Sequence, residues 1–275
     1  MLLARTAAAA ILGTVMFAGA TRPHATPALR MAQMIKAVPT DKKLIAFTFD
    51  DGPNRRWTPQ VLSLLAQHHA HATFFVIGQE VTRCPDVIQS ISRAGMEIGN
   101  HGMHHRWLRN LTEEAVKADI TGGADAIVAA GGPRPYLYRL PAALADDAAR
   151  RALGALHYTV VSWSIDTRDW RRGTSSQRIA QTVMREAAPG KIVIMHDGPA
   201  HREATLAALR EVLPALQARG YRIVTVGDLL RHSQFAAQRA IPPAPVPTAQ
   251  KPKAKLVRGS RPRSVFPRDW LRRIG

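Results

Sequence analysis

The feature that most constrains the fold is a regular alternation of apolar, strand-like runs and helical segments between residues 42 and 230. Strands that alternate with helices build a mostly parallel sheet, so the pattern predicts an α/β fold. With about seven strand–helix units, both an open sheet and a barrel are compatible with it. The expected strands cover residues 44–50, 72–78, 96–101, 136–140, 157–165, 191–197 and 221–226, and the expected helices cover 58–70, 85–93 and segments that begin at 112 and after 145, 174 and 202.

Chemically active side chains follow five of the expected strands, at the point where each strand ends. In barrels of parallel strands, active residues collect at the carboxyl ends of the strands. Chance would place one or two such residues there, but hardly five sets, so we expect these side chains to share one site. The residues are Asp50 and Asp51, His101, Arg139, Asp166 and Asp169, and His196 and Asp197.

The stretch TFDDGP places Asp50 and Asp51 side by side at the end of the first expected strand. A surface turn would explain the pair, because Asp favours turns and Gly-Pro breaks regular structure. The apolar run LIAFTF before it favours a buried approach and a functional pair instead. One carboxylate and two histidines would form a donor set for zinc or another divalent ion, with positions left for water. The second carboxylate would then be available as a base.

The stretch HGMHH contains His101, His104 and His105. Histidines three or four residues apart share one face of a helical turn, from which two of them can bind one ion. The stretch QHHAHA at residues 67–72 is as rich in His, but it lies at a helix C-terminus, so we interpret it as structural. Cys84 is the single cysteine, so the chain forms no internal disulfide and a metal must be held by His and carboxylates. We do not expect Cys84 to be catalytic, because a nucleophilic Cys needs an oriented base.

Five motifs in this order carry a family resemblance: TFDDGP (48–53), HGMHH (101–105), RLPAA (139–143), DTRDW (166–170) and IVIMHD (192–197). Together they resemble the polysaccharide deacetylases of carbohydrate esterase family 4, which share the nodulation-protein-B homology domain. The resemblance implies a distorted (β/α) barrel of about seven strands, in agreement with the strand pattern. It also implies a metal-dependent hydrolase that removes acetyl groups from a glycan.

The resemblance further implies which residues bind the metal and which move protons. Asp51 would bind a divalent ion together with His101 and His105, with zinc expected and cobalt or nickel as alternatives. Asp50 would be the general base, and His196 would be the general acid for the leaving amine. Two further residues would position this pair, Arg139 on Asp50 and Asp169 on His196.

The remaining implied roles concern the bound acetyl group. The backbone N–H of Ala142 would donate to the oxyanion of the tetrahedral intermediate. Trp170 and Met195 would shape a pocket for the acetyl methyl group.

The chain departs from the family pattern at two motifs. Gly102 stands where the family usually has Ser or Thr after the first His, so a hydroxyl that would steady the loop is absent. Leu140 and Ala142 stand where a Pro and an aromatic residue usually follow the Arg, so an aromatic wall of the substrate groove is absent. These changes bear on the substrate more than on the metal or the reaction. His104 is an unassigned histidine and the alternative to His105 as ligand.

The two ends of the chain differ in composition from the part between them. In residues 1–25, Arg5 is the only charge before an apolar stretch, and small-x-small sites follow, which is typical of an export signal. A membrane span needs about 20 apolar residues, which favours a cleaved signal over an uncleaved anchor. Residues 26–41 are expected to be a linker, and residues 42–234 the catalytic domain. We therefore expect a periplasmic, extracellular or cell-wall location.

Residues 235–275 are expected to be a disordered tail rich in proline. From residue 241 the tail has nine Lys and Arg and one acid, Asp269, and so supplies much of the net charge of +18. Its functional interpretation is tethering to an anionic cell-wall polymer or membrane surface, and the alternative is a solvated tail without a partner. Nucleic acid is not an expected partner, because the chain carries an export signal.

The expected function is removal of N-acetyl groups from a glycan that contains N-acetylglucosamine, such as peptidoglycan or a chitooligosaccharide. An O-deacetylase of xylan-like glycans is the nearest alternative, and the sequence does not separate the two. A small-molecule amide or imide hydrolase and a non-catalytic cell-wall binding protein on the same fold are the others. The non-catalytic alternative predicts loss of the base, the acid or a metal ligand, and none of these residues is lost.

Overall fold

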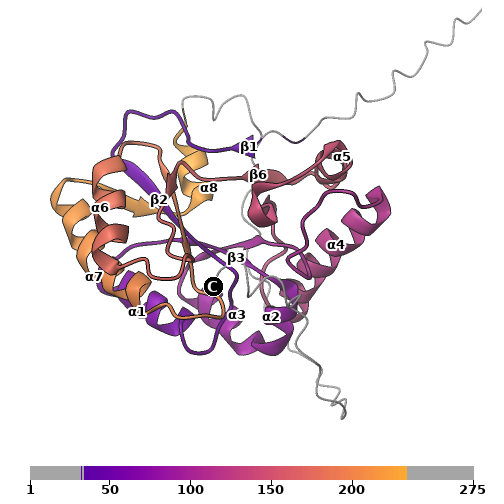
Figure 1. Ribbon diagram of the computed structural model, residues 1–275, viewed down its shortest axis with the longest axis horizontal. Helices are drawn as coiled ribbons and strands as arrows, with labels where there is room; N and C mark the ends of the chain where they lie inside the picture. The colour runs from indigo at the N-terminus through magenta and orange to yellow at the C-terminus, as the bar shows by residue number, and fades with distance from the viewer. Residues whose placement is uncertain (1–31, 33, 234–275) are drawn as a thin grey trace, which may run out of the picture.

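The computed structural model describes residue 32 and residues 34–233, and their centre is a parallel β-sheet (Figure 1). The strand order is β1-β6-β5-β4-β3-β2-β8-β7, and β9 also pairs with β2. Every pair of neighbouring strands is parallel, as the alternating pattern predicts. The strands are β1 (Met34–Ile35), β2 (Leu44–Asp50), β3 (Thr73–Val76), β4 (Glu97–Asn100), β5 (Leu137–Tyr138), β6 (Thr159–Val161), β7 (Ile165–Asp166), β8 (Ile192–His196) and β9 (Arg222–Val224).

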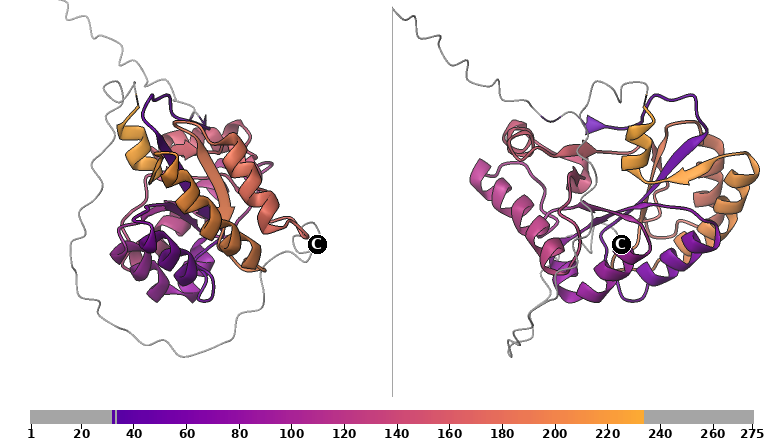
Figure 2. Two further views of the ribbon diagram at one scale, coloured as in Figure 1. Left: turned by 90° about the vertical axis from the view of Figure 1, so that its left-hand side faces the viewer. Right: turned by 180° about the vertical axis from the view of Figure 1, so that it is seen from behind.

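Helices cover the outer face of this sheet, and Figure 2 shows the layer from the side and from behind. The expected helices are all present, and Thr112, where one of them was expected to begin, caps α4 by accepting a hydrogen bond from the Ala115 N–H at 3.2 Å. Two short helices, α2 and α8, were not expected, because six residues are too few for a helical pattern. The helices are α1 (Thr58–Gln67), α2 (Gly78–Arg83), α3 (Pro85–Arg93), α4 (Glu113–Ala129), the 3₁₀ turn η1 (Pro141–Ala143), α5 (Asp147–Ala155), α6 (Ser176–Glu186), α7 (Glu203–Ala218) and α8 (Val226–Arg231).

The sheet curls into a distorted barrel, and one expected strand is split between the two ends of the strand order. Residues 157–165 form β6 and β7, which lie near opposite ends of the strand order although only three residues separate them. The fold class expected from the sequence is thus confirmed. The segment that follows β1 also crosses between the ends: Met34 pairs with Val160, and the Val38 N–H donates to the Gly190 carbonyl at 2.9 Å.

The described residues include the end of the expected linker, but neither the expected signal nor the expected tail. The end of the expected linker, residues 34–38, contains β1 and the buried Val38, so the ordered domain begins before residue 42. A strand of two residues carries no readable alternation, which is why the sequence did not reveal it. The expected signal at 1–25 and the tail at 235–275 lie outside the described residues. Within the described part of the chain, no helix is long and apolar enough to cross a membrane.

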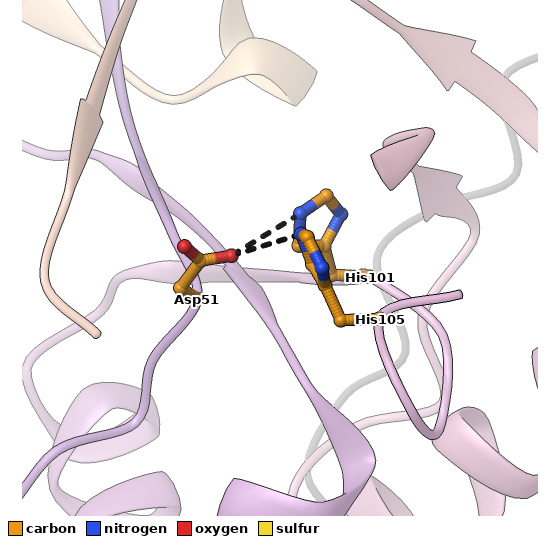
Figure 3. Close-up of side chains that lie close together, drawn as sticks. All are labelled: Asp51, His101 and His105. Atoms are coloured by element: carbon orange, nitrogen blue, oxygen red, sulfur yellow. Dashed lines mark ion pairs between the residues drawn. The ribbon is translucent and has the colours of Figure 1, made fainter. Parts of the chain in front are cut away.

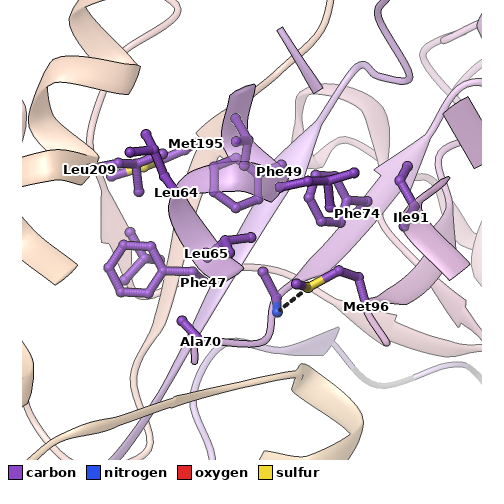
Figure 4. Packing of buried hydrophobic residues seen from close by; sticks show 14 of the residues in the cluster. Phe47, Phe49, Leu64, Leu65, Ala70, Phe74, Ile91, Met96, Met195 and Leu209 are labelled. Atoms are coloured by element: carbon purple, nitrogen blue, oxygen red, sulfur yellow. Dashed lines mark hydrogen bonds between the residues drawn. The ribbon is translucent and has the colours of Figure 1, made fainter. Parts of the chain in front are cut away.

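The strand β2 is buried on both faces, and its alternation decides where the polar residues point. Phe47 and Phe49 pack outward in a core with residues of α1, α3 and α7 (Figure 4). Ala46 packs in a separate inner cluster with Phe75 of β3. Because side chains alternate along a strand, Thr48 and Asp50 share the inward face with Ala46. The barrel interior therefore becomes polar toward its carboxyl end.

Candidate active site

The turn after β2 holds Asp51 in a conformation that few residues adopt. Its φ is 71°, in the left-handed region, where Asp is among the better tolerated residues. A Cβ on Gly52 would lie 2.5 Å from Oδ1 of Asp197, and a Cβ on Gly198 would lie 2.3 Å from the Cβ of Asp51. Glycine is thus required at both positions for the chain to turn this closely. The close turn lets neighbouring carboxylates approach one site.

Asp51, His101 and His105 form the one group in the described residues that has the donors and spacing of a metal site (Figure 3). Oδ1 of Asp51 lies 3.5 Å from Nε2 of His101 and 3.3 Å from Nε2 of His105. This oxygen is buried and has no hydrogen-bond partner among the described residues. A buried polar atom without a partner is rare, and here it faces two imidazole nitrogens. The donor set therefore fits a divalent ion such as zinc.

The imidazole of His101 is oriented by a second contact on its other nitrogen. Its Nδ1 lies 2.8 Å from the carbonyl oxygen of Arg139, to which it donates as Nδ1–H. This leaves Nε2 as the lone-pair nitrogen toward Asp51, the arrangement that metal-binding histidines generally have. The first residue after β4 is thus fixed by the first residue after β5.

The histidines do not lie on a helical turn, so the reason expected for their convergence was wrong. Residues 101–105 form a loop in which Gly102 has a φ of 80° and His105 a φ of 53°. These left-handed conformations fold the chain back, so that His101 and His105 meet at a ring-centroid distance of 4.9 Å. His104, the alternative ligand, is not in the group, and its Nδ1 lies 2.9 Å from Oδ1 of Asp119.

Asp50 and Arg139 form a buried ion pair beside this group. Nη1 of Arg139 donates to Oδ1 of Asp50 at 2.7 Å and to Oγ1 of Thr48 at 2.6 Å. Nη2 and Nε donate to the carbonyls of Ser162 and Val161, which follow and end β6. Oδ2 of Asp50 lies 3.9 Å from Nε2 of His101. Arg139 therefore fixes one carboxylate oxygen and leaves the other near the metal group.

His196 and Asp169 form a second buried pair, from the end of β8 and the loop after β7. Nδ1 of His196 lies 2.7 Å from Oδ1 of Asp169, and the backbone N–H of His196 donates to Oδ2 at 2.9 Å. The hydroxyl of Thr205 donates to the same Oδ2 at 2.8 Å. Both oxygens of Asp169 are thus occupied, and Nε2 is the nitrogen of His196 that can meet a substrate.

The electrostatics favour the charged forms of Asp51 and His196 and the neutral form of His105. Burial alone would raise the pKa of Asp51, but His105, His101 and His196 outweigh it and hold that pKa well below its usual range. Burial alone would lower the pKa of His196, but Asp169 outweighs it and raises that pKa. For His105, burial prevails and lowers the pKa, which favours the neutral, ligating imidazole.

The three residues expected around the acetyl group differ from one another in burial and position. Met195 is fully buried in the outer core with Phe49 and Leu209, so it does not line the site (Figure 4). Strand alternation gives the reason, since Ile194 and not Met195 shares the inward face with His196. Ala142 lies on η1 with a φ of 55°, and Trp170 is 38% exposed next to Asp169.

Asp197 and Asp119 are buried carboxylates to which the sequence assigned no role. Asp197 follows His196, its backbone N–H donates to the Asp50 carbonyl at 3.1 Å, and Oδ2 accepts from the Thr58 hydroxyl. Burial raises the pKa of Asp197 to about 7. Its position at the end of β8 had placed it among the residues expected to share the site, without a role of its own. Asp119 lies on α4, 14 residues after His105, and no sequence signal links it to the loop that it contacts.

The chain is similar to several known proteins. A family model described as polysaccharide deacetylase matches residues 37–161. A peptidoglycan-N-acetylglucosamine deacetylase of Bacillus cereus is 42% identical over 197 residues, covering 71% of this chain and 92% of the relative. A chitooligosaccharide deacetylase of Rhizobium leguminosarum is 38% identical over 199 residues, covering 67% and 90%. A solved structure of a peptidoglycan N-acetylglucosamine deacetylase matches with a TM-score of 0.70 at 29% identity, covering 73% of this chain and 94% of that chain.

Proposed function

The chain belongs to the polysaccharide deacetylase family, and on that premise we propose that it removes N-acetyl groups from a glycan containing N-acetylglucosamine, with a divalent metal as cofactor. The substrate is of the peptidoglycan or chitooligosaccharide type, for which two of the relatives are named. One observation carries the proposal: Asp50 and Asp51 are neighbours with different partners. Oδ1 of Asp51 accepts no hydrogen bond and faces Nε2 of two histidines, and Asp50 is held by Arg139.

The metal would be held by Asp51, His101 and His105. An ion bound there polarises the acetyl carbonyl and makes nearby water more acidic. Asp50 takes the proton from the attacking water through Oδ2, because Oδ1 is engaged by Arg139. The water oxygen then adds to the carbonyl carbon, and the N–H of Ala142 donates to the resulting oxyanion.

The acid on the other side of the reaction is His196. When the C–N bond breaks, its electron pair leaves with the amine nitrogen, which takes the proton from Nε2 of His196. Asp169 supports this step, because its contact with Nδ1 orients the ring and raises the pKa of His196. The products are acetate and a free amino sugar.

Exposed apolar side chains support a sugar polymer as substrate. Four large hydrophobic residues are exposed in the described part of the chain, and three of them lie on loops that hold site residues. Trp107 follows His105 by two residues, Leu144 follows Ala142 by two, and Trp170 follows Asp169 directly. Aromatic rings with polar surroundings are suited to the apolar faces of sugar rings.

The test is a product assay on metal-free protein with and without added zinc or cobalt. N-acetylated chitooligosaccharides, peptidoglycan, acetylated xylan and a cyclic imide are compared, and both acetate and free amine are measured. Equal amounts of acetate and amine, dependent on the metal, support the proposal. Acetate without amine identifies an O-deacetylase, turnover of the imide alone identifies a small-molecule hydrolase, and no turnover of any compound identifies a non-catalytic protein.

The location follows from the composition of the two ends and belongs to the same proposal. The signal at residues 1–25 exports the protein, and the basic residues 241–275 hold it near an anionic cell-wall polymer or membrane surface. Removing residues 241–275 should leave activity on a soluble oligosaccharide unchanged and weaken retention on cell walls at low salt. Retention equal to that of the full chain would show that the tail has no such role.

A further inference from the structure

The loop 101–105, which contains two of the three candidate metal ligands, has no regular structure of its own. It is held from one side by α2: the N–H of Gly78 donates to the Gly102 carbonyl at 2.9 Å, and the N–H of Gln79 donates to the Met103 carbonyl at 3.0 Å. Two polar groups of the loop are not bound by α2, namely the N–H of Met103 and the side chain of His104. Both are bound by another residue.

That partner is Asp119 of α4, which is 4% exposed. Its Oδ2 accepts from the Met103 N–H at 3.1 Å, and its Oδ1 lies 2.9 Å from Nδ1 of His104. The Asp119 backbone carbonyl also accepts from the Met103 N–H at 3.0 Å. One carboxylate thus binds two consecutive residues in the middle of the loop, between His101 and His105.

The space occupied by Asp119 explains the glycine at position 102. A Cβ on Gly102 would lie 2.5 Å from Oδ2 of Asp119 and 3.2 Å from the Tyr138 hydroxyl. The φ of 80° at Gly102 is also strained for any residue with a Cβ. The hydroxyl side chain that the family pattern has here is therefore excluded by the carboxylate, which binds the loop in its stead.

We propose that Asp119 is the positioning residue of the metal centre, and that Gly102 and Asp119 together replace the loop hydroxyl. This inference rests on the proposed function, since it assumes that the loop binds a metal. Asp119 is not among the residues that would hold the ion. It limits the conformations of the loop, so that His101 and His105 are already near Asp51 before the ion arrives.

The first experiment measures zinc affinity by competition with a chelator, for the full chain with Asp119→Ala and Asp119→Asn. Asp119→Ala should lose about 10- to 100-fold in affinity, the range for residues that orient metal ligands. Asp119→Asn should lose less, because its amide oxygen still accepts from Met103. The matched control is Asp125→Asn, an exposed acid on the same helix that pairs with Arg134 at the surface. Affinity of folded Asp119→Ala within twofold of the wild type would overturn the proposal.

The second experiment tests the link between the two positions. Gly102→Ser alone should weaken zinc binding, because its Cβ meets Asp119. The double variant Gly102→Ser with Asp119→Ala should bind zinc more tightly than the two single losses combined predict, since the clash is relieved. Strictly additive losses would contradict the exchange of hydroxyl for carboxylate.

The third measurement separates this inference from the proposed function. Amide hydrogen exchange of Met103, measured without metal, should become faster in Asp119→Ala, because its N–H loses the carboxylate and keeps only the backbone carbonyl as acceptor, and it should stay unchanged in Asp125→Asn. Unchanged exchange in Asp119→Ala would refute the positioning role. Wild-type protein that binds no zinc would refute the proposed metal site, whatever the exchange rates are.

Discussion

The two ends of the parallel sheet each hold an enclosed carboxylate, and the two carboxylates are treated differently. At the amino edge (Thr73, Glu97, Tyr136 and Gly227), Oε2 of Glu97 accepts from the Thr73 hydroxyl at 2.7 Å and the Gly227 N–H at 2.9 Å. Its Oε1 accepts from the Tyr136 hydroxyl at 2.8 Å. At the carboxyl edge (Asp50, Asp51, His101, Arg139 and His196), Oδ1 of Asp51 has no such donor.

The difference separates a carboxylate that stabilises the fold from one that can bind a ligand. Glu97 ties β3, β4 and β5 to α8, and a Cβ on Gly227 would lie 2.3 Å from its Oε1. Both oxygens of Glu97 therefore already accept hydrogen bonds from the protein. Oδ1 of Asp51 is a buried acceptor that receives no hydrogen bond and faces two imidazoles. A buried acceptor of this kind is costly by itself and favours a bound cation. Substitutions at the carboxyl edge should therefore lower activity, whereas substitutions at the amino edge should lower stability and leave activity unchanged.

The largest effect is expected for Arg139→Met at the carboxyl edge. The substitution leaves Asp50 buried without its cation, which should cost about 3–5 kcal/mol in the free energy of unfolding. Activity should fall below detection, because the base loses its orientation. Urea denaturation measures the free energy of unfolding, and an acetate assay measures activity. A variant as stable and as active as the wild type would show that the ion pair contributes to neither stability nor activity.

The next effect is a change in pH dependence for Asp169→Asn. His196 must be protonated to act as acid, so kcat should fall as pH rises through its raised pKa. Without Asp169, burial prevails and lowers that pKa, so the alkaline limb of the profile should move to lower pH. We expect kcat at neutral pH to fall about 100-fold. An alkaline limb at the same pH in both proteins would exclude His196 as the group that titrates there.

At the amino edge, Glu97→Gln should change stability and leave catalysis unchanged. In the variant, an amide NH2 group replaces one of the Glu97 oxygens that accept hydrogen bonds in the wild type. Its nitrogen then faces a donor, which should cost about 1–3 kcal/mol in the free energy of unfolding. The urea midpoint should fall with an unchanged m-value, and zinc affinity and kcat/KM should match the wild type. A clear loss of zinc affinity would show that the two edges are coupled, against the comparison above.

The smallest effect is expected from the exposed rim. Trp170→Ala should raise KM for a chitooligosaccharide several-fold, since an aromatic contact contributes about 0.5–1.5 kcal/mol, and should leave kcat within about twofold. Val128→Ala is the control, because Val128 is comparably exposed but lies near the end of helix α4 and not on a loop that holds site residues. Equal KM values in all three proteins would mean that Trp170 does not contact the substrate.

The sequence predicted the elements that depend on local pattern and failed where tertiary packing decides. The strand ends with Asp50, His101, Arg139 and His196 converge, because parallel strands share one carboxyl edge. The loop geometry of His101 and His105 was not predictable, because left-handed conformations at residues 102 and 105 depend on their packing. Met195 was expected to line the site, but side chains alternate along β8, so its neighbour Ile194 faces inward instead.

The remaining gaps have the same physical origin. A split strand at 157–165 follows from closure of the barrel, which no local pattern records. Asp119 acts on a loop that precedes it by 14 residues, through the packing of α4 on α2. Glycine at position 102 was visible as a departure, but its cause was visible only once a Cβ there met the carboxylate.

The central claim is that neighbouring aspartates divide the work, with Asp51 for the metal and Asp50 for the proton. Calorimetric titration of zinc into Asp50→Asn and Asp51→Asn tests it most directly, with the acetate assay run on the same samples. We predict that Asp50→Asn binds zinc with near wild-type affinity and has no turnover, whereas Asp51→Asn loses zinc binding itself. Equal loss of zinc affinity in the two variants would contradict the division of roles.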